Sequence, residues 1–189
     1  MLFEGKGEQN TEDALKVAVS KAAELGINHL VLASNTGATV EKLLKIIGKE
    51  EKVSLNIVGV THHVGFKEPG NDEMGVEVRK RLEEAGVKLL TTTHLLAGVD
   101  RALRYKFQGV YPAEIIASSL RIMGQGLKVC VEISSMALDA GLVPYGEEII
   151  AVAGSGRGAD TAVVIVPAHS NYFFDSQVKE VLCTPRDKK

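Results

Sequence analysis

Apolar residues recur along this chain in two patterns, as short continuous runs and as longer stretches with helical spacing. Short runs rich in apolar residues predict β-strands. Strands are predicted in this way at 29–33, 55–60 and 87–90. Apolar residues spaced three or four positions apart predict amphipathic helices. Helices are predicted in this way at 15–25, 40–47 and 74–85. Helix and strand therefore alternate in the first half of the chain, which is the pattern of an α/β sheet.

The second half of the chain begins with a long helical stretch. Between 95 and 142 the sequence has no strand pattern. Helices are predicted instead near 98–107, 112–123 and 127–140. Two further strands are predicted at 148–153 and 161–166. About seven residues connect these two strands, which is too short for a parallel crossover, so we expect them to be antiparallel.

Together these elements predict one three-layer α/β/α sandwich that includes residues 1–189, with a helical crossover at about 95–142. We expect its sheet to hold about five strands, mostly parallel, with 161–166 as an antiparallel edge strand. This apolar edge and the neighbouring Phe173 and Phe174 could pair two copies of the chain. The sequence therefore leaves a homo-oligomer open.

Composition and charge exclude several classes of partner. The chain has 189 residues, of which 45% are hydrophobic, and a formal net charge of -2 with both signs interspersed. Without a basic patch, neither nucleic acid nor an anionic membrane surface is an expected partner. No apolar stretch approaches the roughly 20 residues that cross a bilayer, and the first residues lack the apolar segment of a signal peptide. We therefore expect a cytoplasmic protein with a small-molecule ligand.

The segment Ser34–Thr39, Ser-Asn-Thr-Gly-Ala-Thr, lies where the first predicted strand ends and the next helix begins. A helix N-terminus carries unpaired N–H groups and a partial positive charge, and so suits a phosphate group. Three hydroxyl groups and a glycine would face that phosphate. The segment has no lysine at the spacing of a triphosphate-binding loop, which argues against triphosphate hydrolysis. It predicts a phosphorylated ligand.

A second glycine-rich segment, Gly154–Gly158, follows the strand at 148–153. Its Gly-x-Gly-x-Gly pattern is not a dinucleotide-binding loop, because such a loop opens a helix and this one precedes a β-branched run. Ligands of open α/β sheets bind at the carboxyl ends of the parallel strands. We therefore expect Arg157 to lie near Ser34–Thr39, where its guanidinium group could bind phosphate.

Three of the five histidines, His62, His63 and His94, follow predicted strands. They are candidates for general acid–base catalysis or for hydrogen bonding to a ligand. Their spacing matches no metal-binding motif, so no metal site is predicted. Glu132 interrupts an apolar helical run, and the sequence leaves open whether it is a buried, paired carboxylate or a residue on an exposed helix face.

The order of these elements resembles the C-terminal α/β domain of pyruvate kinase over nearly the whole chain. The segments that carry the resemblance are Ser34–Thr39, the strand ending Val58–Thr61, and Glu148–Gly154 with its glycine loop. The resemblance implies that a sugar-phosphate effector binds near Ser34–Thr39 and Gly154–Gly158. Because the chain has no counterpart of the catalytic barrel, we do not expect an active pyruvate kinase. It is similar to stand-alone archaeal and bacterial proteins of this type.

A shorter resemblance is to flavodoxins, whose FMN phosphate loop has the pattern Ser-x-Thr-Gly-x-Thr seen in Ser34–Thr39. It implies FMN as the cofactor and a flavin-dependent role. FMN is our first hypothesis, because a single phosphate requires no strong cluster of cations. A regulatory domain that binds a sugar phosphate without catalysis is the alternative. The predicted binding residues are Ser34, Asn35, Thr36, Gly37, Ala38, Thr39, Thr61, His62, His63, Gly154, Ser155, Gly156, Arg157 and Gly158.

Overall fold

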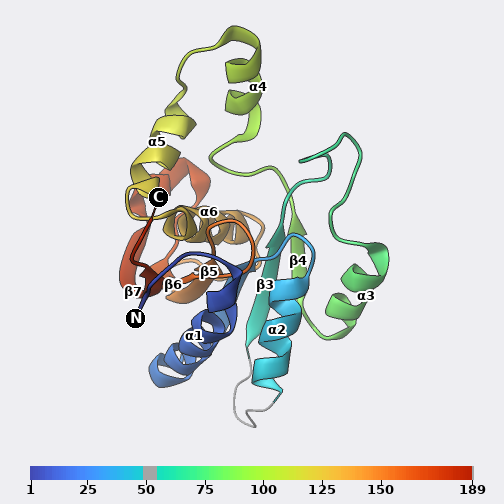
Figure 1. Ribbon diagram of the computed structural model, residues 1–189, viewed down its shortest axis with the longest axis vertical. Coiled ribbons are helices and arrows are strands. Elements are labelled where there is room, and N and C mark those ends of the chain that lie inside the picture. The colour runs from blue at the N-terminus through green and yellow to red at the C-terminus, as the bar shows by residue number, and fades with distance from the viewer. Residues whose placement is uncertain (49–54, 189) are drawn as a thin grey trace.

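One sheet runs through the centre of the computed structural model, which describes residues 1–48 and 55–188 (Figure 1). Its seven strands lie in the order β1-β7-β6-β5-β2-β3-β4. They are β1 (Leu2–Phe3), β2 (His29–Ala33), β3 (Asn56–Thr61), β4 (Lys88–Thr91), β5 (Ile149–Ala153), β6 (Thr161–Val166) and β7 (Gln177–Pro185). Among the described strands, β6 runs antiparallel to both of its neighbours, and the other pairings are parallel. The predicted α/β fold is confirmed.

The sheet has more strands than the sequence predicted. The five predicted strands are β2 to β6, and β6 is antiparallel to β5 as the short connection requires, with Ala153 opposite Thr161. However, β7 and β1 add to the far side of β6, so β6 is an inner strand and not the edge. The apolar pattern missed β1 because it has only two residues, and β7 because its first five positions are exposed. The edge that we expected to pair two copies is therefore covered by β7.

Helices cover both faces of the sheet. They are α1 (Thr11–Leu25), α2 (Ala38–Ile47), α3 (Val76–Glu84), α4 (Gly98–Phe107), α5 (Pro112–Arg121) and α6 (Gln125–Asp139). Successive side chains of a strand point to opposite faces. Leu30 accordingly packs in the core with α1, α2 and α3, whereas its neighbour Val31 packs in a second core with α6. The result is the predicted three-layer α/β/α arrangement.

The stretch predicted to be helical contains α4, α5 and α6. We call residues 98–121, which form α4 and α5, the arm, and Figure 1 shows it projecting beyond the end of the sheet. Pro112 begins α5, where its missing N–H leaves no helical hydrogen bond unmade. α6 then returns across the sheet, and most of its residues are buried. None of the described helices is long and apolar enough to cross a membrane.

Candidate functional site

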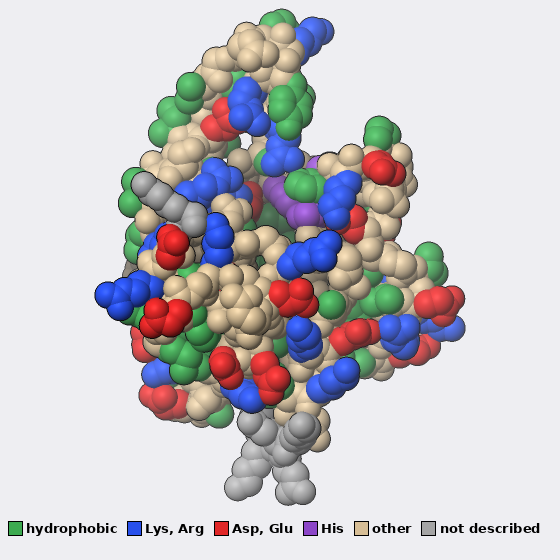
Figure 2. Space-filling model, viewed as in Figure 1, with side chains coloured by type: hydrophobic (Ala, Val, Ile, Leu, Met, Phe, Trp, Pro, Cys, Tyr) green, Lys and Arg blue, Asp and Glu red, His purple; other side chains and the backbone are tan. Residues whose placement is uncertain are grey.

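A cavity of about 610 Å³ opens at the carboxyl ends of β5, β2 and β3. These three strands are parallel neighbours, so the loops that follow them meet at one edge of the sheet. Residues of α6 line a further wall, and the arm overhangs the opening. Figure 2 shows the hollow beneath the arm, with histidine side chains inside it and lysine and arginine side chains around it. The predicted binding residues that line it are Ser34, Asn35, Thr36, Ala38, Thr39, Thr61, His62, Gly154, Gly156, Arg157 and Gly158.

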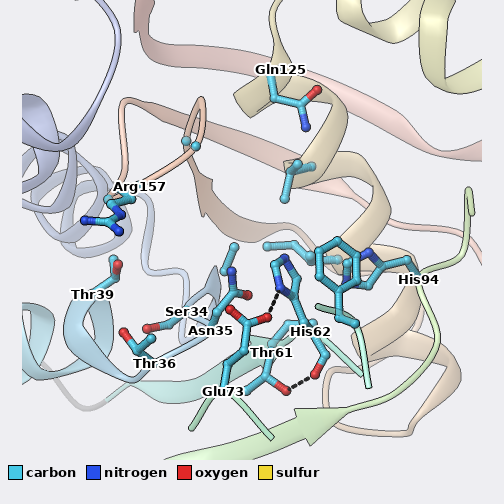
Figure 3. Close-up of a pocket in the computed structure, with 18 of the residues that line it drawn as sticks. Ser34, Asn35, Thr36, Thr39, Thr61, His62, Glu73, His94, Gln125 and Arg157 are labelled. Atoms are coloured by element: carbon cyan, nitrogen blue, oxygen red, sulfur yellow. Dashed lines mark hydrogen bonds and ion pairs between the residues drawn. The ribbon is translucent and has the colours of Figure 1, made fainter. Parts of the chain in front are cut away.

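The N-terminus of α2 forms one side of this cavity (Figure 3). Ser34 is 5% exposed, and its Oγ has no hydrogen-bond partner among the described residues. No described side chain caps α2 either, although hydroxyl groups of Thr36 and Thr39 lie beside it. Buried polar groups are nearly always hydrogen-bonded, and a helix N-terminus needs acceptors for its free N–H groups. This end of the cavity therefore holds unsatisfied donors on an electropositive surface.

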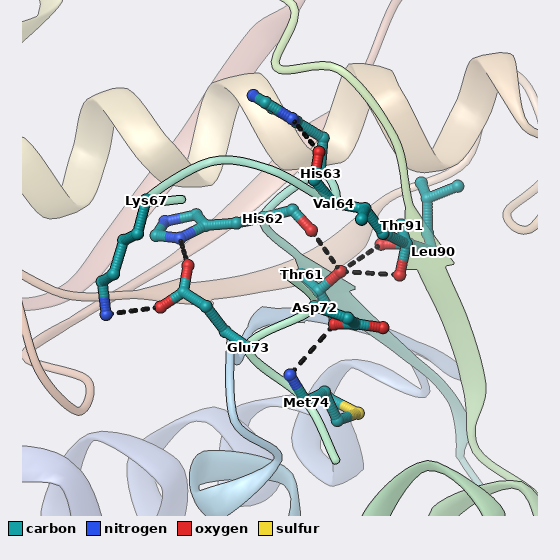
Figure 4. Close-up of polar contacts among 10 residues, drawn as sticks. All are labelled: Thr61, His62, His63, Val64, Lys67, Asp72, Glu73, Met74, Leu90 and Thr91. Carbon is teal, nitrogen blue, oxygen red and sulfur yellow. Dashed lines mark hydrogen bonds and ion pairs between the residues drawn. The ribbon is translucent and has the colours of Figure 1, made fainter. Parts of the chain in front are cut away.

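Three of the predicted binding residues do not line the cavity. Gly37 has φ 89°, and a Cβ atom there would lie 2.6 Å from Cγ1 of Val78, so this glycine allows α3 to pack against α2. The N–H of Ser155 donates to Asp160 at 3.1 Å. Nδ1 of His63 lies 2.8 Å from the carbonyl oxygen of Val64, and Figure 4 shows the His63 ring turned away from Glu73.

The glycine loop 154–158 is held in place by a hydrogen bond to Asp160 and by its own tight turn. The buried carboxylate of Asp160 accepts hydrogen bonds from the backbone N–H groups of Ser155 at 3.1 Å and Gly7 at 3.0 Å. A Cβ atom at Gly154 would lie 2.4 Å from the carbonyl oxygen of Gly158, so the loop closes too tightly for a side chain. Arg157 is exposed, lines the cavity and has no ion-pair partner among the described residues. It is therefore free to bind an anion near Thr39 (Figure 3).

His62 and Glu73 form a pair on the opposite side of the cavity (Figures 3 and 4). Nδ1 of His62 lies 2.5 Å from Oε2 of Glu73, and Oε1 of Glu73 accepts from Lys67 at 2.6 Å. Burial alone would raise the pKa of Glu73, but its hydrogen bonds to Lys67 and His62 outweigh this and lower the pKa. The ring of Phe66 stacks on His62 with centroids 3.7 Å apart. His62 is thus fixed in one orientation.

A buried ion pair lies behind these rings. Lys128 and Glu132, one turn apart on α6, are 5% and 3% exposed, and the Lys128 ammonium group contacts Oε2 of Glu132. Oε1 of Glu132 accepts the backbone N–H of Leu96 at 2.7 Å. Burial lowers the pKa of Lys128, although Glu132 opposes this shift. Of the two readings that the sequence left open for Glu132, the buried, paired carboxylate is correct.

Sequence reasoning missed most of the cations at this site. Besides Arg157, the cavity is lined by Lys42, Lys67, Arg101, Arg121 and Lys128. These residues come from α2, the loop that follows β3, the arm and α6, and nothing in their sequence spacing places them together. Our expectation of a site without a strong cluster of cations was therefore wrong. Within residues 1–48 and 55–188, no group of three or more His, Cys, Asp and Glu side chains could hold a metal ion.

We expect His94 to make the stability of the fold depend on pH. Burial lowers the pKa of His94 to about 4 from its usual 6.5. Below about pH 6.5 the unfolded chain therefore binds a proton that the folded chain binds only near pH 4, so stability is lost as the pH falls through this range. Urea denaturation measures how far the free energy of unfolding falls between about pH 7 and about pH 4.5. This fall should be smaller in His94→Asn than in the unmodified protein, by on the order of 2 kcal/mol. An equal drop in both proteins would contradict this assignment.

Known proteins resemble the chain as follows. Residues 12–165 match the family described as pyruvate kinase, alpha/beta domain. A crystal structure of a pyruvate kinase from Cryptosporidium parvum matches with 19% identity and a TM-score of 0.42, over 83% of this chain and 23% of that one. A pyruvate kinase of the same organism in complex with ADP matches with 18% identity and a TM-score of 0.41, over 82% of this chain and 22% of that one. The chain thus spans less than a quarter of these enzymes.

Proposed function

This chain belongs to the family of pyruvate kinase alpha/beta domains, and from that premise we propose that it binds a phosphorylated small molecule in the cavity above β5, β2 and β3. A phosphate group lies at the N-terminus of α2, against Ser34 and Thr36. Arg157 contacts it from the glycine loop. The family resemblance, which implies a sugar-phosphate effector at these two loops, supports the same position.

One observation carries this proposal: the Oγ of Ser34 is buried without a partner at the uncapped N-terminus of α2. An unsatisfied buried polar group costs about 1–3 kcal/mol, and a bound phosphate oxygen would remove that cost. The free N–H groups of the first helical turn and the helix dipole favour a negative charge at the same point. A phosphate monoester satisfies all of these groups at once.

The charge of the cavity favours a ligand with two phosphate groups. Six cationic side chains and three carboxylates line it, and the three carboxylates each form an ion pair with Lys42, Lys67 or Lys128. The other three cations, Arg101, Arg121 and Arg157, have no carboxylate partner among the described residues. Arginine suits phosphate because its planar group donates two parallel hydrogen bonds. A sugar bisphosphate matches this excess better than a monophosphate does.

FMN remains a second candidate because of the aromatic wall. The rings of His62, Phe66 and His94 lie with centroids 3.7 to 5.3 Å apart, and Arg101 lies over the Phe66 ring. Such a wall offers flat surface to a flavin ring. The volume of about 610 Å³ is also in the range of sites for cofactors of this size.

Calorimetric titration with fructose 1,6-bisphosphate, FMN and unphosphorylated fructose tests the proposal. We expect the bisphosphate to bind, fructose not to bind, and FMN to bind more weakly. Ser34→Ala should weaken binding by roughly tenfold or more, because a hydrogen bond to a charged group contributes about 1.5–3 kcal/mol. Thr92→Ala, an exposed threonine outside the cavity lining, is the matched control. Failure of both phosphorylated probes to bind would overturn the proposed function. Tight binding of FMN alone would make FMN the proposed ligand in place of a sugar bisphosphate.

A further inference from the structure

We propose that the cavity catalyses proton transfer, in which His62 Nε2 removes a proton from the carbon next to the carbonyl group of a bound sugar phosphate. The inference rests on the proposed function, because the N-terminus of α2 and Arg157 must hold the phosphate group of the substrate. It adds to that function a reaction class, namely enolisation with exchange or isomerisation. The geometry of His62 and Glu73 carries it.

The Glu73 carboxylate determines which nitrogen of His62 can act as the base. Nδ1 of His62 lies 2.5 Å from Oε2 of Glu73, and Oε1 of Glu73 lies 2.6 Å from Nζ of Lys67. An ionised carboxylate can only accept a hydrogen bond, so Nδ1 carries the hydrogen. The Glu73 side chain is 8% exposed, so this arrangement is largely shielded from water. With the hydrogen on Nδ1, the lone pair of His62 is on Nε2, which has no hydrogen-bond partner among the described residues. A histidine oriented by a carboxylate is the usual arrangement of a general base.

The neighbouring side chains suit the charges that develop during this reaction. The Lys128 ammonium group lines the same cavity, and Glu132 accepts one of its three protons, which leaves two donors for an oxyanion. A buried cation at that position stabilises negative charge more strongly than it would in water. His94, whose ring centroid lies 5.1 Å from that of His62, has a pKa lowered to about 4 by burial. It therefore adds no positive charge next to His62 at neutral pH.

The reaction needs no further reactant. His62 Nε2 takes the proton, the electrons of the broken C–H bond form a carbon–carbon double bond, and the carbonyl electron pair moves to oxygen. The resulting enediolate oxygen is bound by Lys128. The protonated His62, after its proton exchanges with solvent, returns a proton to the same carbon, which gives exchange. Where that carbon bears a hydroxyl group, His62 can instead protonate the former carbonyl carbon. Lys128 then gives a proton to the enediolate oxygen and takes the hydroxyl proton, so that the hydroxyl-bearing carbon becomes the carbonyl carbon of the isomer. Atoms and electrons balance in both cases.

Hydrogen exchange in deuterated water tests this step. The probes are fructose 1,6-bisphosphate and dihydroxyacetone phosphate, and proton NMR follows loss of the C–H signals next to the carbonyl group. We expect exchange well above the rate without protein, and a fall of roughly 100-fold or more in His62→Gln, because general base catalysis contributes that much. His169→Gln, on the far histidine that pairs with Asp139, is the control and should exchange at the rate of the unmodified protein.

Binding of the same probes is measured in parallel by calorimetry. Probes that bind but do not exchange would overturn this inference and leave the proposed function intact. If neither probe binds but FMN does, this inference fails and a phosphorylated ligand still occupies the cavity. If FMN also does not bind, the proposed function itself fails. Exchange that persists unchanged in His62→Gln would also overturn the inference, because another group would then be the base.

Glu73 is a positioning residue, and a split between binding and turnover separates that role from a structural one. Glu73→Gln can still accept a hydrogen bond from Nδ1 but loses the charge that pairs with His62 and Lys67. The exchange rate at saturating probe should fall roughly tenfold while the calorimetric affinity for the probe stays unchanged, and Glu73→Asp, which keeps the charge, should recover part of the rate. Equal losses of affinity and rate would reject the positioning role.

Discussion

Glu132→Leu should lower the free energy of unfolding by about 3–5 kcal/mol, because it leaves the buried ammonium group of Lys128 without a counter-charge. Lys128 is 5% exposed, and Glu132 is its ion-pair partner on the same helix. The substitution also removes the acceptor of the Leu96 N–H. Urea denaturation near neutral pH measures the loss.

The double variant Lys128→Met/Glu132→Leu separates the charge from the packing. Removing both charges restores an apolar interior, so most of the loss should be recovered. A loss of about 1–3 kcal/mol in the free energy of unfolding should remain, since the Leu96 N–H stays unsatisfied. Glu84→Gln breaks the exposed pair Lys80–Glu84, which has the same spacing on α3, and should change stability by at most about 0.5 kcal/mol. Equal effects of Glu132→Leu and Glu84→Gln would show that burial of the first pair is unimportant.

Ala38→Glu should abolish binding of fructose 1,6-bisphosphate. Ala38 is the first residue of α2, is exposed and lines the cavity, so the new carboxylate would occupy the position proposed for the phosphate group. Its charge repels the ligand, and its side chain competes for the same N–H groups. The affinity should fall by more than roughly 100-fold, which corresponds to about 2.8 kcal/mol of binding free energy.

This substitution should not unfold the protein. An acidic residue in the first turn of a helix interacts favourably with the helix dipole, by about 0.3–1 kcal/mol. Thermal denaturation should therefore show unchanged or slightly higher stability. Ala23→Glu adds the same charge at an exposed position of α1 outside the cavity lining and should bind normally. Normal binding by Ala38→Glu would move the phosphate group away from α2.

Much of the fold followed from local patterns, and the failures have specific causes. The strands β2 to β6 have apolar runs because helices cover both faces, and such runs are visible in a sequence. β7 was missed because five of its positions face solvent. The seven-residue connection predicted the direction of β6 correctly, whereas its inner place depends on pairing with a strand later in the chain.

The loops of the site were likewise predictable, but their partners were not. Ser34, His62 and Arg157 follow parallel strands, and parallel neighbours bring such loops to one edge of a sheet. The pair of His62 with Glu73 depends on how the loop 62–75 folds back, and no periodicity encodes that path.

The sequence by itself determined the order of the six helices and of β2 to β6 among the described elements, the direction of β6 and the loops that border the cavity, because each depends on residues close together in the chain. Tertiary structure alone decided the charge of the cavity. Arg101 comes from the arm, Arg121 from its end and Lys128 from α6. Only the placing of the arm over the cavity and of α6 across the sheet brings these cations to the cavity that Ser34 lines. Tertiary structure also decided the role of Gly37, which leaves room for Val78 where α2 and α3 pack together. No local sequence pattern determines how closely these two helices approach.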